Sequence, residues 1–233
     1  MDSKAWAKQN KKKFVAEFLS GSWTKAEGDE RPMGIFMAGL PGSGKTELSR
    51  AIIKGIREKV LRIDMDEIAS KIPGYTPERA DEFREGASIL LSEIFSKAIR
   101  SRMWFIMDGT FSGGQAIKNL QASMQRDYIL GLIYIHQDPK MAWEFTLARE
   151  KVEHRAINFD GFLNSYGKMR SNLMSLNGAT EMFFLVVEKD KSNHPSKFLP
   201  SMGHEKFDHL LKTKYNLDKE MKELEDGFSK NQN

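Results

Sequence analysis

Eight consecutive residues near the start of the chain combine glycines, a lysine and a threonine in an order that suits phosphate binding. Glycines let a loop curl until successive backbone N–H groups point at phosphate oxygens, and a following helix adds the positive end of its dipole. The pattern stands between an apolar run and a helical run, which disfavours the alternative of a glycine-rich turn that binds nothing. The loop consists of Gly39, Leu40, Pro41, Gly42, Ser43, Gly44, Lys45 and Thr46.

Two side chains at the end of this loop predict its cofactors. Lys45 stands at the position from which an ammonium group reaches the outer phosphates of a nucleotide. The Thr46 hydroxyl stands at the position that ligates a magnesium ion. The sequence therefore predicts that the chain binds ATP together with Mg²⁺.

Two carboxylates follow the second apolar run of the chain. Asp64 and Asp66 lie where a strand would end, and open α/β sheets bind their ligands at the carboxyl ends of the strands. A carboxylate placed there can accept the proton of a substrate hydroxyl. Taken alone, either residue suits equally well the capping of a helix that begins near Glu67.

A third carboxylate and two arginines complete the candidate chemistry. Asp108 ends the apolar run from Trp104, which is typical of a carboxylate that orients magnesium-bound water, and it could also bond the turn at Thr110. Arg149 and Arg155 could neutralise the charge on a transferred phosphoryl group, although helix arginines are usually solvated. Arg155 would lie on a mobile lid. The five histidines lack metal-ligand spacing and predict no second metal site.

The elements that must position these residues alternate between strands and helices. This alternation predicts an α/β fold, a doubly wound five-stranded parallel sheet of the P-loop kinase type with helices on both faces and appended N- and C-terminal helices. The expected strands are 33–38, 59–63, 103–107, 129–135 and 182–187. The expected helices are 3–20, 45–57, 77–100, 115–125, 139–154, 159–176 and 204–224.

Chain organisation and composition set the remaining expectations. We expect an N-terminal helical extension and linker over 1–31, a kinase core over 32–190, and a C-terminal loop and helix over 191–233. The first helix could pack on its own domain or contact a partner. With no cysteine and no long apolar run, the sequence predicts a soluble cytoplasmic protein without a membrane segment. A net charge of +4 is too small to predict nucleic-acid binding.

The phosphate loop, the Asp64–Asp66 pair, the Asp108-Gly-Thr110 turn and the two arginines together resemble the zeta toxin family of P-loop kinases, from about residue 33 to 176. In that family the toxin phosphorylates UDP-N-acetylglucosamine, and a small antitoxin protein restrains it. The resemblance implies that Asp66 is the catalytic base. It also implies that Glu93 contacts the substrate, with Asp64 and Thr110 beside it, and that Lys45, Arg149 and Arg155 contact phosphate.

One departure from the family pattern leaves the identity of the phosphate acceptor undetermined. The family carries a substrate-binding arginine shortly after the Gly-Thr pair, where this chain has Phe111 and Ser112. A nucleotide or polynucleotide 5′-hydroxyl kinase would need the same loop, base and lid. A nucleotide-dependent switch module is the other alternative, but the Asn-Lys-x-Asp tetrapeptide of switch GTPases does not occur in the sequence.

Overall fold

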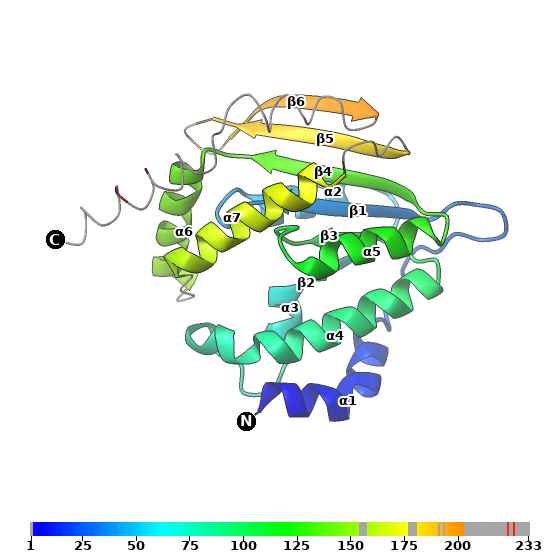
Figure 1. The fold of residues 1–233 in the computed structure, drawn as a ribbon. Helices are drawn as coiled ribbons and strands as arrows, with labels where there is room; N and C mark the ends of the chain where they lie inside the picture. Colours follow the sequence, from blue (N-terminus) through cyan, green and yellow to red (C-terminus); the bar gives the residue numbers. More distant parts are fainter. Residues whose placement is uncertain are drawn as a thin grey trace.

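The computed structural model describes residues 2–153, 158–176, 181–190, 192, 194–202, 223 and 226. Its centre is a sheet with the strand order β2-β3-β1-β4-β5-β6 (Figure 1). The strands from β1 to β5 are parallel to their neighbours, while β6 runs antiparallel to β5. The strands are β1 (Met33–Gly39), β2 (Leu61–Asp64), β3 (Phe105–Asp108), β4 (Ile129–His136), β5 (Met182–Lys189) and β6 (Pro195–Met202).

The antiparallel strand β6 corrects the predicted five-stranded parallel sheet. The sequence predicts a loop after residue 190, but residues 195–202 pair with β5 and add a sixth strand at the sheet edge. This strand carries Pro195 and Pro200, and its side chains are mostly exposed. An edge strand of this kind tolerates proline and needs no apolar alternation, so its pattern gives no strand signal. The helix predicted over 204–224 lies, apart from residue 223, outside the described residues.

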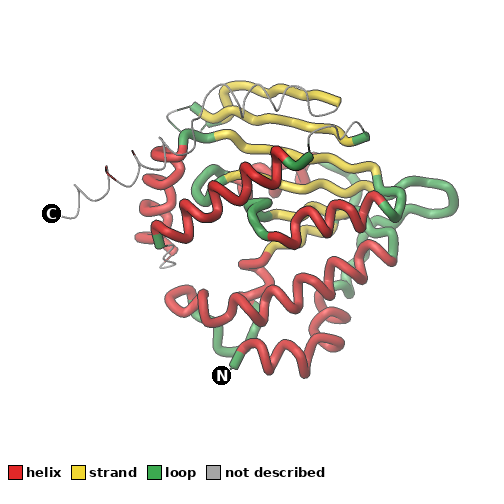
Figure 2. The backbone as a smooth tube through the Cα atoms, viewed as in Figure 1, coloured by secondary structure: helices red, strands yellow, loops and turns green. Residues whose placement is uncertain are grey.

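Helices cover both faces of the sheet, as predicted (Figure 2). On one face, α2 packs Leu48, Ile52 and Ile53 against the smaller apolar cluster of β1, β3, β4 and β5. The other described helices contribute to the larger cluster, with Phe36 and Phe105 near its centre. The helices are α1 (Ser3–Phe18), α2 (Lys45–Gly55), α3 (Met65–Ser70), α4 (Ala80–Arg100, after the 3₁₀ turn Pro77–Arg79), α5 (Gly114–Met124), α6 (Pro139–Glu153) and α7 (Phe159–Met174).

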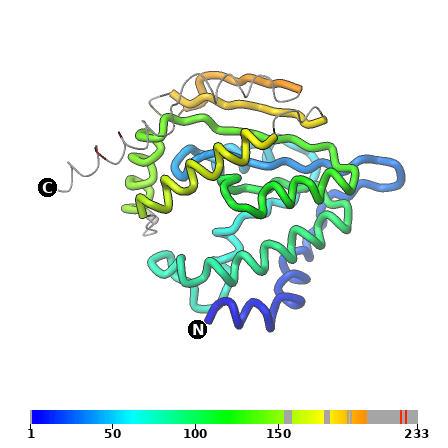
Figure 3. The backbone as a smooth tube through the Cα atoms, viewed as in Figure 1, coloured from blue at the N-terminus to red at the C-terminus, as the bar shows by residue number. Residues whose placement is uncertain are grey.

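The N-terminal helix α1 packs along α4 of its own chain (Figure 3). The Ser3 hydroxyl donates to the carbonyl oxygen of Glu82 over 2.6 Å, and Lys11 forms an ion pair with Glu93 at 2.6 Å. A Cβ at Gly86 would lie 2.5 Å from the Ser3 carbonyl oxygen, so this close approach requires glycine. No helix among the described residues is both long and apolar enough to cross a membrane.

Candidate phosphate-binding and phosphoryl-transfer site

The phosphate loop joins β1 to α2 and opens on the N-terminus of that helix. Gly44 is the N-cap of α2 with φ of 82°, in the left-handed region, and no side chain caps the helix. The free N–H groups of the first turn therefore face the loop, as anion binding requires. Gly42 also has positive φ, and a Cβ there would lie 2.7 Å from the Thr146 hydroxyl and collide with the carbonyl oxygen of Ala142. Helix α6 thus packs directly against the loop.

The loop holds a buried polar atom that the described protein does not satisfy. Ser43 is fully buried, and its hydroxyl oxygen has no hydrogen-bond partner. Buried hydroxyl groups are nearly always paired in folded proteins. This hydroxyl and the uncapped helix N-terminus both fit a loop that receives phosphate oxygens.

Lys45 lies at the centre of the charged groups that the sequence predicts. Its ammonium group donates to the carbonyl oxygen of Leu40 over 2.6 Å. Burial lowers the pKa of Lys45 to about 8, Asp108 and Asp66 oppose that shift, and Arg149 adds to it. Electrostatic effects weaken with distance, so these three groups are near enough to act on the charge of Lys45. Thr46 follows in the first turn of α2 and is partly buried.

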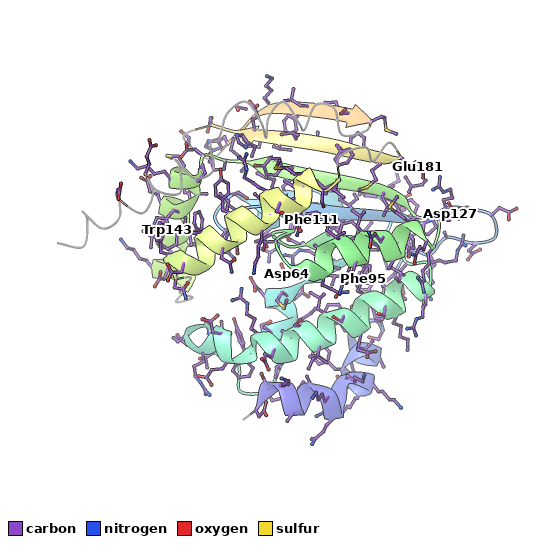
Figure 4. The ribbon with its side chains drawn as sticks, in the orientation of Figure 1. Asp64, Phe95, Phe111, Asp127, Trp143 and Glu181 are labelled. Carbon is purple, nitrogen blue, oxygen red and sulfur yellow. The ribbon has the colours of Figure 1, made fainter. Side chains whose placement is uncertain are left out.

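The two carboxylates after β2 have different structural roles. The Oδ1 atom of Asp64 accepts hydrogen bonds from the backbone N–H groups of Asp66 at 2.7 Å and Glu67 at 3.0 Å, so Asp64 is the N-cap of α3. Figure 4 labels Asp64. Burial raises the pKa of Asp64, and the nearby Arg62 opposes that rise. Asp66 stands in the first turn of α3, with its side chain partly exposed.

Arg62 on β2 joins three carboxylates, which sequence reasoning missed. Its Nη2 and Nε atoms donate to Oδ2 of Asp108 at 2.7 and 3.0 Å, and its Nη1 atom donates to Glu67 at 3.1 Å. Nη2 also bonds Asp64. The Ser49 hydroxyl of α2 donates to the same Asp108 oxygen over 2.7 Å. The sequence feature that could have indicated this role is the charge of Arg62 inside the apolar strand predicted over 59–63.

The loop after β3 brings Thr110 beside the phosphate loop. The backbone N–H of Gly39 approaches the Thr110 carbonyl oxygen at 3.5 Å, and the hydroxyl groups of Thr110 and Ser112 share a hydrogen bond. Asn172 of α7 donates to the carbonyl oxygen of Phe111 over 2.8 Å and fixes this turn. Ser112 therefore lies on the same loop as Thr110, where the resembling family carries its arginine.

Three further predicted residues have different outcomes. Arg149 is exposed on α6 and acts electrostatically on Lys45. Glu93 is on α4 in its ion pair with Lys11, 2.6 Å away on α1, so its predicted role in substrate binding remains a prediction. Arg155 lies outside the described residues, and its roles in the lid and in phosphate binding remain predictions.

Lys189 is a second cation at the loop that the sequence analysis did not single out. Its Nζ atom lies 2.7 Å from the point that a Cβ on Gly44 would occupy. Burial lowers the pKa of Lys189, while Glu47 and Asp190 oppose the shift. The feature that could have indicated Lys189 is its position at the carboxyl end of β5, because open α/β sheets bind their ligands at that edge.

Comparisons with known proteins agree with this geometry. A family model described as zeta toxin matches residues 20–197. The toxin of the PezAT toxin–antitoxin system of Streptococcus pneumoniae is similar in structure, with a TM-score of 0.63 at 16% identity, covering 96% of this chain and 92% of that chain. The AvrRxo1-ORF1:-ORF2 complex gives a TM-score of 0.54 at 12% identity, with coverages of 90% and 71%. No curated protein matches the sequence.

The family match extends over most of the chain and includes the phosphate loop and the carboxylates that follow β2 and β3. The structural matches have low sequence identity and show a shared α/β fold alone. The chain belongs to the zeta toxin family of P-loop kinases.

Proposed function

We propose that the chain transfers the γ-phosphate of ATP to a hydroxyl group of a small substrate. The observation that carries this proposal is geometric: the uncapped α2 begins at Lys45, and its Ser49 hydroxyl binds Asp108 at the carboxyl ends of the parallel strands, where Asp108 is in register with Asp64. The phosphate-binding lysine and the carboxylates that follow β2 and β3 then lie at one edge of the sheet. A module that only binds a nucleotide has no need for the partly exposed Asp66 carboxylate at this edge.

Nucleotide and metal both fit the residues present. The unpaired Ser43 hydroxyl and the open N-terminus of α2 suit the phosphates, and an AvrRxo1-ORF1:-ORF2 complex of similar fold has been crystallised with ATP. Thr46 and Asp108 supply the oxygen atoms that Mg²⁺ prefers, and would hold the ion. A bound ion would neutralise charge on the phosphate oxygens. Ser49 and Arg62 orient the Asp108 carboxylate for that role.

Asp66 takes the proton in the proposed reaction. The substrate oxygen forms a bond to the γ-phosphorus while the bond from that phosphorus to the β,γ-bridging oxygen breaks, which releases ADP. The hydroxyl proton passes to the Asp66 carboxylate. Lys45 and Arg149 stabilise the negative charge on the transferred group. Asp64 contributes by capping α3 and so fixing the backbone of Asp66.

We propose a nucleotide-linked amino sugar, UDP-N-acetylglucosamine, as the acceptor, with Thr110 and Glu93 as contacts. Membership of the zeta toxin family supports this choice. Ser112 stands in place of the family's arginine, so the contact that this arginine would make must come from another residue or be absent. A small antitoxin is the proposed protein partner, since the similar Streptococcus pneumoniae protein comes from a toxin–antitoxin system. We place both proteins in the cytoplasm, where nucleotide sugars are made.

The proposal is tested with radiolabelled ATP. The parent and the Asp66→Asn variant are incubated with UDP-N-acetylglucosamine, with a 5′-hydroxyl oligonucleotide, or with no acceptor. Label that moves to the sugar nucleotide in the parent alone supports the proposal. Label on the oligonucleotide would select the polynucleotide kinase alternative, and release of free phosphate alone would select the switch module.

The Ser112→Arg variant tests the acceptor separately. If the pocket is otherwise of the family type, the added guanidinium should lower the KM for UDP-N-acetylglucosamine by about tenfold, as expected for a charge-assisted hydrogen bond. The KM for ATP should not change. An unchanged KM for the sugar nucleotide would indicate a different acceptor.

A further inference from the structure

A groove of about 880 Å³ lies at the sheet edge formed by β2, between α1, α2 and α3. Its volume is in the range of small-molecule sites. Within the described part of the chain, its lining includes no residue of the phosphate loop and neither Asp66 nor Asp108. The groove therefore does not include the phosphate loop or the proposed base, although Arg62 of its lining also binds Asp108 in the neighbouring site.

Aromatic side chains form the apolar wall of the groove. Trp6, Phe14 and Phe18 come from α1, and Trp23 comes from the segment that follows it. Trp6 meets Phe14 edge-on with ring centroids 6.1 Å apart, and Phe14 stacks with Phe18 at 6.2 Å. Such a wall favours a flat ring, which can stack on these faces or meet them edge-on.

Unneutralised positive charge lies along the opposite side. Arg50 and Lys54 project from one face of α2, four residues apart, and Lys71 follows α3. Among the described residues, none of these three cations has a carboxylate within ion-pair distance. The acidic groups of the lining are already paired.

These acidic groups are Glu17 and Glu67. Glu17 lies 3.9 Å from Lys13, and Glu67 lies 3.1 Å from Arg62. The charge that remains for a ligand is therefore positive, and it attracts an anionic group.

We propose that this groove is a second ligand site, which takes a small molecule carrying both an aromatic ring and an anionic group. The ring lies against Trp6, Phe14 and Trp23. The anionic group faces Arg50, Lys54 and Lys71. The proposal does not rest on the kinase activity, because none of the ring contacts and cations just named has a role in the proposed phosphoryl transfer; Arg62 is the lining residue that also positions Asp108.

The test uses the full chain and 1-anilinonaphthalene-8-sulfonate, a probe with aromatic rings and a sulfonate group. We expect saturable binding, read as energy transfer from tryptophan to the probe, that persists with excess ATP and magnesium chloride. Lys54→Glu should weaken probe binding by about tenfold or more, as loss of a hydrogen bond to a charged group predicts. Absence of saturable binding, or displacement of the probe by ATP, would overturn the proposal.

Lys97→Glu is the matched control. Lys97 is exposed in the last turn of α4, as Lys54 is in the last turn of α2, so both reversals disturb a helix end alike. Only the Lys54 variant should lose probe binding. Equal losses in both variants would show a general effect of surface charge and would refute the site.

A tryptophan pair tests the aromatic wall without changing charge. Trp23→Leu removes a flat ring from the wall and should weaken probe binding by about fivefold, within the range for loss of an aromatic pair. Trp104→Leu is the control, since the Trp104 ring packs in the cluster under α2. Equal probe affinity in Trp23→Leu and the parent would contradict the place of this ring in the site.

Discussion

Arg62 donates to the same oxygen of Asp108 that the Ser49 hydroxyl reaches, at 2.7 Å in each case. This shared oxygen ties β2 to β3 and to the helix that begins at Lys45. The side chains of Arg62 and Asp108 are only 12% and 2% exposed, so the ion pair is shielded from water. Arg62 therefore sets the position of the carboxylate that we assign to magnesium, although it contacts no phosphate in the proposal.

Replacing Arg62 with methionine should destabilise the protein strongly. Asp64 and Asp108 would remain buried without their cation, and breaking a buried pair in this way costs about 3–5 kcal/mol. Arg79→Met is the control, because the Arg79–Glu82 pair is about half exposed and should cost about 0–1 kcal/mol. Urea unfolding measures both values. If both variants lost a similarly small part of the free energy of unfolding, the buried ion-pair network would contribute little to stability.

The carboxylates after β2 should separate by function when each is changed to asparagine. Asp66→Asn should keep ATP binding and melting temperature while phosphate transfer falls by about a hundred- to ten-thousand-fold, the usual effect of removing a general base. Asp64→Asn should lower stability, because it weakens the contact with Arg62. Transfer assays and thermal unfolding are compared for both variants. If Asp66→Asn transferred phosphate at the parent rate while Asp64→Asn was inactive, Asp64 would be the base and Asp66 would have the structural role.

Lys45→Met should abolish ATP binding without unfolding the protein. The pKa of Lys45 is lowered from 10.5 to about 8, mainly by burial, so between pH 8 and 10.5 the folded protein without ligand favours the neutral amine while the unfolded chain keeps the ammonium. Between these values the unfolded chain binds more protons, and the free energy of unfolding should rise with pH in the parent. Lys45→Met should lack this rise. Urea titrations at pH 7.5 and 10 test it, and identical pH trends would contradict the shifted pKa.

Gly42→Ala should disable the phosphate loop. The new methyl group would meet the Thr146 hydroxyl and the Ala142 carbonyl oxygen at a positive φ of 78°, which disfavours side chains. We expect loss of ATP binding and about 1–3 kcal/mol of stability. Gly55→Ala is the control: no atom lies near its Cβ position at the end of α2, and alanine there favours the helix. Calorimetric ATP titration that shows normal affinity in Gly42→Ala would contradict the tight contact with α6.

Lys189→Met should raise the KM for ATP about tenfold with a smaller change in kcat. The Nζ atom lies over Gly44, where it would add a charge-assisted hydrogen bond to the nucleotide phosphates. Lys197→Met on β6 is the control, since that side chain is exposed on the added edge strand. Steady-state kinetics distinguish the two. An unchanged KM in Lys189→Met would limit this lysine to a structural role.

The sequence by itself determined the phosphate loop and the parallel core of the sheet. Phosphate binding depends on backbone conformation and on a following helix, and both are encoded locally in Gly39–Thr46. The apolar strands were visible for the same reason, because a strand buried on both faces is a continuous apolar run. The resemblance to the family rested on these local patterns, and the family match agrees with it.

Only the tertiary structure decided how distant residues meet. Ser49, Arg62 and Asp108 are far apart in sequence, and nothing local in any of them predicts a shared oxygen atom. Lys189 reaches the loop because β5 ends near the N-terminus of α2, and β6 forms because β5 offers an open edge. Glu93 pairs with Lys11 for the same kind of reason, since α1 folds back on α4. Such contacts follow from packing, which single-sequence patterns do not carry.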